Sequence, residues 1–427
     1  MHGAISPGAS DTQRSGSPVS RGLVASPGLQ PAHAHGRCRT PHLELADIVR
    51  AHGEQLLNLT IEQRRAANAI AGCRTALLGG HVYRCEACEY EEISYNSCRN
   101  RSCPKCQNLR ELRWVEKRQA DVLPVEHHHL VFTIPDSLHV LFRTNPRQSY
   151  ALLFASASET LIEVAANPER LGAEIGFMAI LHTWTQTLLY HPHIHCIVPG
   201  GGLSENRSAW MASRKGFFLP VRVLATVFRG KLLSKLQSAL EAQKLQVPPE
   251  HDPRRALARA AGKKWCVYSK PSFAGPEHVI RYLGRYTHRI AISNQRLVSM
   301  EDSQVTFRYK DRSNADRQRV MTLPADEFLH RYFQHVLPTG FVRIRYYGFL
   351  ANCLRARLLP QLRQLLGVVA VLLVPAPPTE TWQEQLLRLT GRDVTRCPAC
   401  RQGHLVKVGT IRPSPKKWSI PSRATSP

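Results

Sequence analysis

Two histidines one residue apart could together hold a divalent metal ion. His193 and His195 lie in HPHIHCIVPGGG, residues 191–202, which has the pattern of a strand closed by its glycine triplet. Alternate side chains of a strand share a face, so both imidazoles point the same way and Ile194 is buried on the other side. The pair therefore indicates one metal site on one face of a strand.

Other histidines compete for a third position in such a site, which Mg²⁺ or Mn²⁺ would need. We expect His182, because the strand-like residues 175–184 could pair antiparallel with the histidine strand. His191 shares the face of the pair but lies one step further along. Residues 127–129, all histidines, equally fit a polar strand entry. The chain has 20 histidines, so a pair alone also fits a protein without this metal.

Two tyrosines on a predicted helix could act as nucleophiles. Tyr282 and Tyr286 follow Pro276, which suits the first turn of a helix, and their spacing places them on one helix face. A phenol with a pKa of about 10 needs an activated electrophile, and a divalent ion on the scissile phosphate would supply one. The product would be a 5′-phosphotyrosine that keeps the bond energy for rejoining. Ordinary core packing has the same aromatic spacing.

Four cysteines have the spacing of two zinc knuckles: Cys85, Cys88, Cys103 and Cys106. Two such pairs complete a tetrahedral Zn²⁺ site, and a closed four-cysteine site is structural. Three further candidates lie nearby and could form a second, incomplete site or exchange with the first: Cys73, His81 and Cys98. The two cysteines could also stay free. Cys397 and Cys400 predict a metal half-site, whose second pair of ligands is missing unless His404 or another chain contributes.

Basic side chains accompany each motif and are expected to contact DNA. The cysteine loop presents cations on a rigid support, and the tyrosine helix carries them on a neighbouring stripe. The strand RIRYYG combines arginine with tyrosine, which suits single-stranded nucleic acid, although a solvated edge strand has the same pattern. A lysine shortly before the tyrosine helix could stabilise charge at the attacked phosphate. The expected contacts are Arg99, Arg101, Lys105, Lys270, Arg281, Arg285, Arg289, Arg343 and Arg345.

The charge of the whole chain favours the same partner. Lys and Arg number 57 against 32 Asp and Glu, a net charge of +25, and such an excess suggests a polyanion. The longest apolar run, residues 365–374, is too short to cross a bilayer, and the first 40 residues lack the apolar core of a secretory signal. We therefore expect a soluble, cytoplasmic, nucleoid-associated bacterial protein with neither a membrane partner nor a small-molecule substrate.

Residue patterns along the chain predict an α+β fold. Strand-like and helical runs alternate behind a small cysteine-rich module, and the runs VTFRYK and RVMTL suggest a hairpin. The expected segments are a disordered extension at 1–40, a zinc-binding DNA-recognition domain at 41–115, a catalytic domain at 120–355, and a basic, proline-rich tail at 356–427.

The order of these motifs resembles the insertion-sequence-91 type transposases, rolling-circle enzymes of the HUH (His–hydrophobic–His) superfamily. The resemblance covers about residues 42–355: the cysteine-rich segment, FTIPD, HPHIHCIVPGGG, YLGRYTHRIAIS and GFVRIRYYGFLAN. It implies a central antiparallel sheet flanked by helices, with the histidine pair on a central strand and the tyrosine helix alongside. It also implies that His193 and His195 bind the catalytic Mg²⁺ or Mn²⁺, that Tyr282 and Tyr286 are the nucleophiles, and that the cysteine module binds structural Zn²⁺.

The resulting expectation is a transposase that nicks and rejoins single-stranded DNA, at transposon ends and in target DNA, through a 5′-phosphotyrosine intermediate. Two alternatives remain. One is a plasmid or phage replication-initiator nuclease with the same chemistry. The other is a zinc-dependent DNA-binding protein without catalytic activity. The sequence does not fix the oligomeric state.

Overall fold

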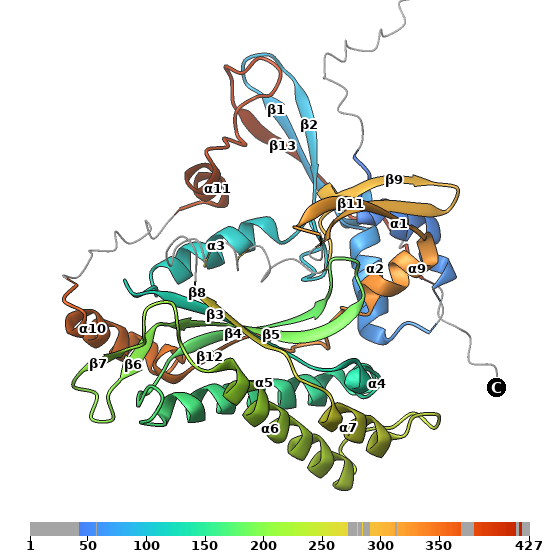
Figure 1. Ribbon diagram of the computed structural model, residues 1–427. Coiled ribbons are helices and arrows are strands. Elements are labelled where there is room, and N and C mark those ends of the chain that lie inside the picture. Colours follow the sequence, from blue (N-terminus) through green and yellow to red (C-terminus); the bar gives the residue numbers. More distant parts are fainter. Residues whose placement is uncertain are drawn as a thin grey trace, which may run out of the picture. The chain divides into compact units, whose positions relative to one another are not determined.

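The computed structural model describes residues 42–56, 58–271, 280, 284, 291–311, 314–368, 380–415 and 418–420. Figure 1 shows the arrangement of its helices and strands. The α-helices are α1 (Leu45–His52), α2 (Ile61–Ala71), α3 (Asn108–Gln119), α4 (His139–Thr144), α5 (Pro146–Ala166), α6 (Val221–Glu241), α7 (Pro253–Gly262), α9 (Ala325–Phe333), α10 (Arg355–Leu365) and α11 (Trp382–Thr390). The strands are β1 (Gly80–Cys85), β2 (Glu91–Tyr95), β3 (His127–Thr133), β4 (Phe177–Trp184), β5 (Tyr190–Pro199), β6 (Gly201–Leu203), β7 (Trp210–Ala212), β8 (Val267–Pro271), β9 (Leu297–Glu301), β10 (Gln304–Asp311), β11 (Arg317–Pro324), β12 (Ile344–Tyr347) and β13 (Leu405–Ile411).

A five-stranded antiparallel sheet in the order β12-β4-β5-β3-β8 carries the histidine pair on its central strand. Strands β4 and β5 are consecutive in the chain and pair as a hairpin. Seven of the eight residues of β4 are buried, which means that the sheet is covered on both faces rather than on one. The predicted fold class, with the histidine motif on a central strand, is therefore confirmed.

Alternation along the strands divides the buried side chains between two cores. Phe132 of β3 and Ile194 of β5 pack toward α5 and α6, together with Phe154 and Phe228 of those helices. Figure 1 shows α5 and α6 on the side of the sheet opposite α3. On the α3 side, the second core includes Met178, Ile180, Ile197 and Ile280, with Trp114 and Val115 of α3 packed against them.

A further core joins the first two helices to a small sheet from the second half of the chain. Strands β9, β10 and β11 form an antiparallel sheet in the order β11-β10-β9, so the predicted hairpin of VTFRYK and RVMTL is confirmed. Phe307 of β10 and Phe328 of α9 are fully buried together with Leu45 and Ile48 of α1. Residues far apart in the sequence therefore build this part of the fold.

The tail differs from the expected separate segment, because it folds back onto the cysteine module. Strand β13 pairs antiparallel with β1, giving a sheet in the order β13-β1-β2. Further on, Ile420 is buried and its backbone N–H donates to Asn68 Oδ1 at 3.1 Å. The module is thus built from both halves of the chain.

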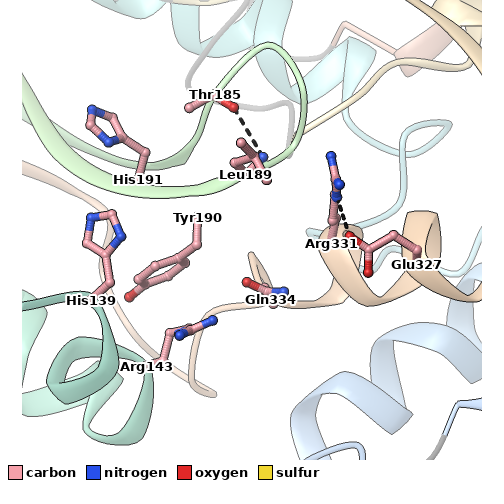
Figure 2. A pocket seen from close by; sticks show the side chains of 9 residues that line it. All are labelled: His139, Arg143, Thr185, Leu189, Tyr190, His191, Glu327, Arg331 and Gln334. Atoms are coloured by element: carbon pink, nitrogen blue, oxygen red, sulfur yellow. Dashed lines mark hydrogen bonds and ion pairs between the residues drawn. The ribbon is translucent and has the colours of Figure 1, made fainter. Parts of the chain in front are cut away.

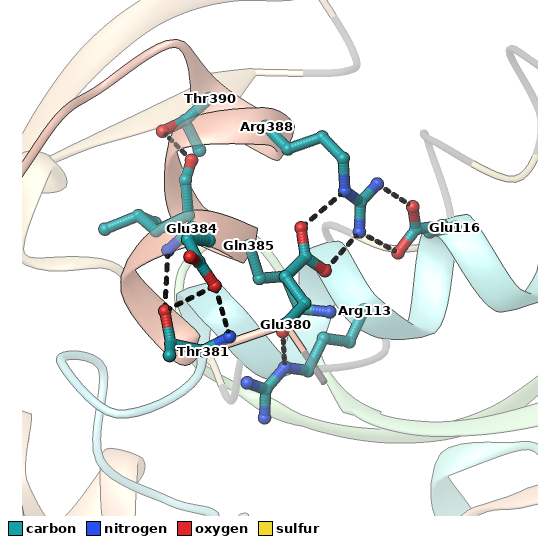
Figure 3. Close-up of polar contacts among 9 residues, drawn as sticks. Arg113, Glu116, Glu380, Thr381, Glu384, Gln385, Arg388 and Thr390 are labelled. Atoms are coloured by element: carbon teal, nitrogen blue, oxygen red, sulfur yellow. Dashed lines mark hydrogen bonds and ion pairs between the residues drawn. The ribbon is translucent and has the colours of Figure 1, made fainter. Parts of the chain in front are cut away.

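Helix α11 of the same tail contacts α3 through polar side chains (Figure 3). Arg388 pairs with Glu116 of α3 and with Glu380, the latter at 2.7 Å between Nε and Oε1, and Arg113 of α3 donates to Gln385. Arg388 and Glu116 are about one-third exposed, and exposed pairs of this kind contribute little to stability. In the described part of the chain, no helix is long and apolar enough to cross a membrane.

Candidate active site

Three histidines from two neighbouring strands converge on the face of the sheet that α3 covers. His182 of β4 lies directly opposite His193 of β5, and Ile180 lies opposite His195, so all these side chains share one face. One ligand nitrogen from each of the three histidines lies within 4.8 Å of the others. The structure therefore places His182 beside the pair, as the sequence predicted, and buries Ile194 on the opposite face.

Hydrogen bonds orient two of these imidazoles. Nδ1 of His193 donates to the carbonyl oxygen of His191 at 2.6 Å. Nδ1 of His195 lies 2.7 Å from Nε2 of His129 on β3, and the two rings stack with centroids 5.0 Å apart. With both Nδ1 atoms engaged in this way, Nε2 is the nitrogen that each ring would offer to a metal.

The donor set has a chemical preference among divalent ions. Imidazole nitrogen suits transition-metal ions, whereas Mg²⁺ prefers oxygen ligands. Among the described residues, the group of three histidines includes no carboxylate. Imidazole suits Zn²⁺, Fe²⁺ and Ni²⁺, and Mn²⁺ shares the oxygen preference of Mg²⁺, so these three side chains alone do not select between the two ions expected from the sequence.

His129 was not singled out by the sequence, which grouped it with its two neighbours. The structure separates the three: His127 Nδ1 bonds to the carbonyl oxygen of Val125 at 2.8 Å, and His128 is buried against the ring of Phe218. Only His129 reaches the metal ligands among these three. The available signal was strand alternation, but it identifies His129 only once the register between β3 and β5 is known.

Lys270 of β8 also lies on this part of the sheet. It pairs directly with His129 in the register of β8 and β3, and directly paired residues of antiparallel strands share a face. Lys270 is therefore placed on the same face as the histidines, one strand beyond His129.

The paired tyrosines, Tyr282 and Tyr286, lie outside the described residues, as do Arg281, Arg285 and Arg289. Two helical residues of the same segment are described. Ile280 is buried in the core on the histidine face of the sheet. Gly284 is buried against α3, where an added Cβ would lie 2.3 Å from Cγ2 of Val115. Ile280 and Gly284, two positions before and after Tyr282 in the sequence, therefore both pack on the α3 side of the sheet.

A cavity of about 440 Å³ opens beside the histidines, between α4, the β4–β5 turn and α9 (Figure 2). Its lining includes His139, Arg143, Tyr190, His191, Glu327 and Arg331. The ring centroid of His191 lies 5.4 Å from that of His193, which joins the cavity to the candidate metal ligands. Burial lowers the pKa of His139 to about 4, with a smaller contribution from His191. The positive charge at neutral pH therefore comes from the two arginines.

The cysteines form two separate groups of four, which corrects the grouping expected from the sequence. Cys103 and Cys106 join Cys73 and Cys98, whereas Cys85 and Cys88 join Cys397 and Cys400. In the first group, Sγ of Cys106 lies 3.4 Å from that of Cys73 and 3.5 Å from that of Cys98. The two knuckles expected to share one ion face different partners, because β1 and β2 separate them in space.

Comparisons with known proteins match this chain to transposases. The family described as "Putative transposase" matches residues 176–357, and "Transposase zinc-binding domain" matches residues 32–134. "Putative transposase y4qJ" of Sinorhizobium fredii is 49% identical over 381 residues, which cover 86% of this chain and 94% of the relative. The transposase for insertion sequence element IS801 of Pseudomonas savastanoi pv. phaseolicola is 30% identical over 340 residues, 77% of this chain and 79% of the relative.

The chain belongs to the insertion-sequence-91 type transposases. It is thus an enzyme that cuts and joins DNA, and DNA is its partner. Two solved structures of the conjugative relaxase TrwC with oriT DNA also match, at 12% and 13% identity over 54% and 57% of this chain and 96% and 95% of theirs. Their TM-scores of 0.22 are too low to support a structural conclusion.

The transposase uses several of its predicted DNA-contacting cations within its own fold. Arg101 donates to the carbonyl oxygen of Phe341 at 2.7 Å, and Lys105 pairs with Glu44. Arg343 is half-buried, and its pKa falls to about 9 because of burial and of the charge of Arg101. Arg99 is exposed. A role of these residues in binding phosphate stays a prediction.

The arginines and tyrosines of RIRYYG make contacts within the fold, and a role of this strand in binding DNA stays a prediction. The guanidinium of Arg345 lies 4.2 Å from the ring centroid of Phe154, and Tyr347 stacks on Phe177 at 5.0 Å. Tyr346 points to the opposite face, where Trp114 Nε1 donates to its hydroxyl at 3.3 Å. The strand is at the edge of the sheet, but helices cover both of its faces. Tyr346 and Tyr347 are therefore half-buried, each packed against one of the two cores.

Proposed function

We propose that this transposase nicks and rejoins single-stranded DNA at the ends of its element by tyrosine transesterification, and so drives rolling-circle transposition. One observation carries the proposal. Three histidines converge on one face of the central sheet, and the same face is packed by Ile280, two residues before Tyr282. The proposal therefore assigns the metal ligands and the candidate nucleophiles to one site, and the packing of Ile280 on the histidine face supports it.

His182, His193 and His195 are the proposed ligands of the catalytic ion. A bound divalent ion would polarise the non-bridging oxygens of the scissile phosphate, which makes the phosphorus a better electrophile. His129 orients the ring of His195 through the hydrogen bond between His129 Nε2 and His195 Nδ1. Lys270 is the proposed cation that stabilises negative charge at the attacked phosphate.

Tyr282 and Tyr286 are the proposed nucleophiles. The phenol oxygen of one tyrosine bonds to phosphorus, and the bond from phosphorus to the 3′ oxygen breaks. The phenol loses its proton and the 3′ oxygen gains one, so a 5′-phosphotyrosine and a free 3′-hydroxyl result. Attack of a 3′-hydroxyl on the phosphotyrosine reverses the step and restores the phenol. Two tyrosines allow two such exchanges without ATP.

The cavity beside His191 is the proposed path of the DNA strand next to the scissile phosphate. Arg143 and Arg331 supply the positive charge there, and Tyr190 supplies an aromatic wall. Arg331 forms an ion pair with Glu327, with 2.7 Å between Nε and Oε1, whereas Arg143 is exposed at the rim of the cavity. Cation and ring together suit a flexible, unpaired strand better than a stacked duplex.

The four cysteines Cys73, Cys98, Cys103 and Cys106 are the proposed structural Zn²⁺ site of the N-terminal module. The matched family is a zinc-binding domain, and the thiols fit the ion because four of them stand within ligand distance of one another. Each residue would act as a thiolate ligand that holds the loop preceding α3.

Cleavage of matched oligonucleotides tests the proposed reaction. The purified protein with Mn²⁺ is given one strand of the element end, or the same sequence as a duplex, and products are separated on a denaturing gel. We expect cleavage of the single strand alone, its loss with a chelator, and its loss in His182→Ala and His193→Ala. Equal cleavage of the duplex, or activity that survives chelation and both substitutions, would contradict the proposal. A fully inactive wild-type protein that still binds DNA would instead favour the catalytically dead alternative.

A further inference from the structure

We propose that Cys85, Cys88, Cys397 and Cys400 hold a second structural Zn²⁺ ion, which fastens the C-terminal segment of the chain to the N-terminal module. The matched zinc-binding family covers residues 32–134 and so reaches only the first two of these cysteines. The proposal is independent of the cleavage chemistry.

The sulfur positions fit a tetrahedral ion. Sγ of Cys85 lies 3.7 Å from Sγ of Cys400, and Sγ of Cys88 lies 3.7 Å from Sγ of Cys397. All four atoms lie within 4.8 Å of one another. Zinc–thiolate bonds of about 2.3 Å place the sulfurs of a regular tetrahedron about 3.8 Å apart. A disulfide would instead require sulfurs about 2.05 Å apart.

The two pairs have the same local structure, although more than half the chain separates them. The N–H of Glu89 donates to the carbonyl of Cys85 at 3.2 Å, and the N–H of Arg401 donates to the carbonyl of Cys397 at 3.1 Å. Glu89 and Arg401 both have a left-handed backbone, with φ of 56° and 59°. The arginine that replaces the glycine common in zinc knuckles therefore adopts the glycine-like conformation.

Backbone N–H groups also point at the sulfurs, as thiolates need when they bind a metal. The N–H of Ala87 donates to Sγ of Cys85 and that of Gly403 donates to Sγ of Cys400, each at 3.4 Å. A Cβ on Gly403 would lie 2.7 Å from Sγ of Cys85, so the two knuckles approach too closely for a larger residue. Cys85 and Cys397 are almost fully buried at this contact.

Counting ligands leads to the same assignment. Six cysteines of the described chain within the matched zinc-binding range belong to the two groups, and one tetrahedral site uses four of them. The pair left over, Cys85 and Cys88, meets the only other pair in these groups, Cys397 and Cys400. The half-site of the tail is thus completed within the same chain. His404 is not needed as a ligand, and its Nδ1 lies 3.3 Å from the hydroxyl of Thr395.

The ion would lie at one end of the ladder between β1 and β13. Strand β13 pairs with β1 from Gly80–Ile411 to Cys85–Leu405, so the last pair of this ladder carries a ligand. Beyond this ladder, the tail contacts the rest through the ion pairs of Arg388 and through Trp418 and Ile420, which pack in the core of α1 and α2. A zinc site of four thiolates would add to these contacts, because the free energy of binding the ion is also free energy of folding.

Zinc counting by native mass spectrometry tests the second site in the full-length chain. Every variant also carries His193→Ala and His195→Ala, so that the histidine site adds no metal. The parent is expected to hold two zinc ions, one for each group of four cysteines. Cys397→Ser with Cys400→Ser should leave one ion, and Cys85→Ser with Cys88→Ser should also leave one. The quadruple variant should still retain one, because all four residues serve the same ion.

Two controls make the outcome decisive. Cys353→Ser with Cys266→Ser removes two exposed cysteines outside both groups and should keep two ions. Charge-state distributions show whether each variant is compact, and the count is taken on the compact population. Two ions remaining after loss of Cys397 and Cys400 would overturn the proposal, as would a parent with one ion. A parent lighter by two hydrogens per bridge and without the second zinc would reveal a disulfide and overturn it equally.

Discussion

Nε2 of His129 lies 2.7 Å from Nδ1 of His195, so a residue of β3 holds the ring of a proposed metal ligand on β5. The diagonal register of the two strands creates this contact, since His129 pairs with Ile197 and His195 pairs with Val131. Partners of this kind fix the orientation and tautomer of a ligand, and their loss weakens metal binding without removing a ligand.

His129→Ala should therefore raise the Mn²⁺ concentration needed for half-maximal cleavage by about 10- to 100-fold. The rate at saturating Mn²⁺ should stay close to that of the wild type, whereas His193→Ala should be inactive at every concentration. A titration of single-strand cleavage with Mn²⁺ measures both. His330→Ala, an exposed histidine of α9, is the matched control and should not change the curve. A normal Mn²⁺ requirement in His129→Ala would remove its positioning role.

Gly284→Ala should slow cleavage because the added methyl group meets Val115 of α3. Its carbon would lie 2.3 Å from Cγ2 of Val115, a separation that cannot be accommodated without a shift, and overpacking of this kind costs about 1–3 kcal/mol. The shift would act on the segment that carries both tyrosines, so single-turnover cleavage should fall at least about tenfold.

Val115→Ala in the same chain should restore much of that rate. Gly230→Ala on α6, where nothing lies within 4 Å, is the control and should leave cleavage unchanged while stabilising the helix by about 0.5–1 kcal/mol. If Gly284→Ala cleaves at the wild-type rate, the tight packing of this segment on α3 is not needed for its position.

Arg143→Ala should weaken binding of single-stranded DNA if the strand passes through the cavity of Figure 2. Loss of one phosphate contact lowers the slope of log affinity against log salt by about 1. Fluorescence anisotropy at several salt concentrations, with a non-cleavable substrate, measures this slope. Arg222→Ala, an exposed arginine of α6, removes the same charge away from the cavity and should leave the slope unchanged. Equal effects of the two substitutions would show that only net charge matters.

Protonation of His335 should lower the free energy of unfolding as the pH falls from 6.5 to 4. Burial lowers the pKa of His335 in the folded protein to about 4, whereas the unfolded chain takes up its proton near the ordinary value of about 6.5. The unfolded state therefore binds more protons in this range, and stability drops by up to roughly 3 kcal/mol. In His335→Gln this part of the pH dependence should disappear, as denaturant titrations at pH 7, 5.5 and 4.5 would reveal. If the free energy of unfolding of His335→Gln fell between pH 7 and pH 4.5 by as much as that of the wild type, the assignment would be contradicted.

Local patterns were enough to predict most strands and helices of the central domain. The strand-like run of residues 175–184 and the glycine-closed run from His191 suggested an antiparallel pair, and in the structure that pair places His182 beside His193. This third histidine could be named because consecutive antiparallel strands are usually neighbours. The correct face followed from alternation alone.

Contacts between distant segments were beyond such patterns. Cys85 and Cys397 have similar local sequences, but nothing in either segment encodes that β13 will pair with β1. The sequence therefore predicted Cys103 and Cys106, the nearest pair along the chain, as partners of Cys85 and Cys88, and this grouping was wrong. His129 was overlooked for the same reason, because its meeting with His195 depends on the register of two strands that are not adjacent in sequence.

The identity of the amino acid joined to DNA tests the central claim most directly. Wild-type protein, Mn²⁺ and a single-stranded element end are allowed to react, the covalent product is digested with trypsin and nuclease, and the modified peptide is sequenced by mass spectrometry. The account predicts a nucleotide attached through its 5′ phosphate to Tyr282 or Tyr286, and no adduct when both are replaced by phenylalanine. An adduct on any other residue, or one that persists in the double variant, would contradict it.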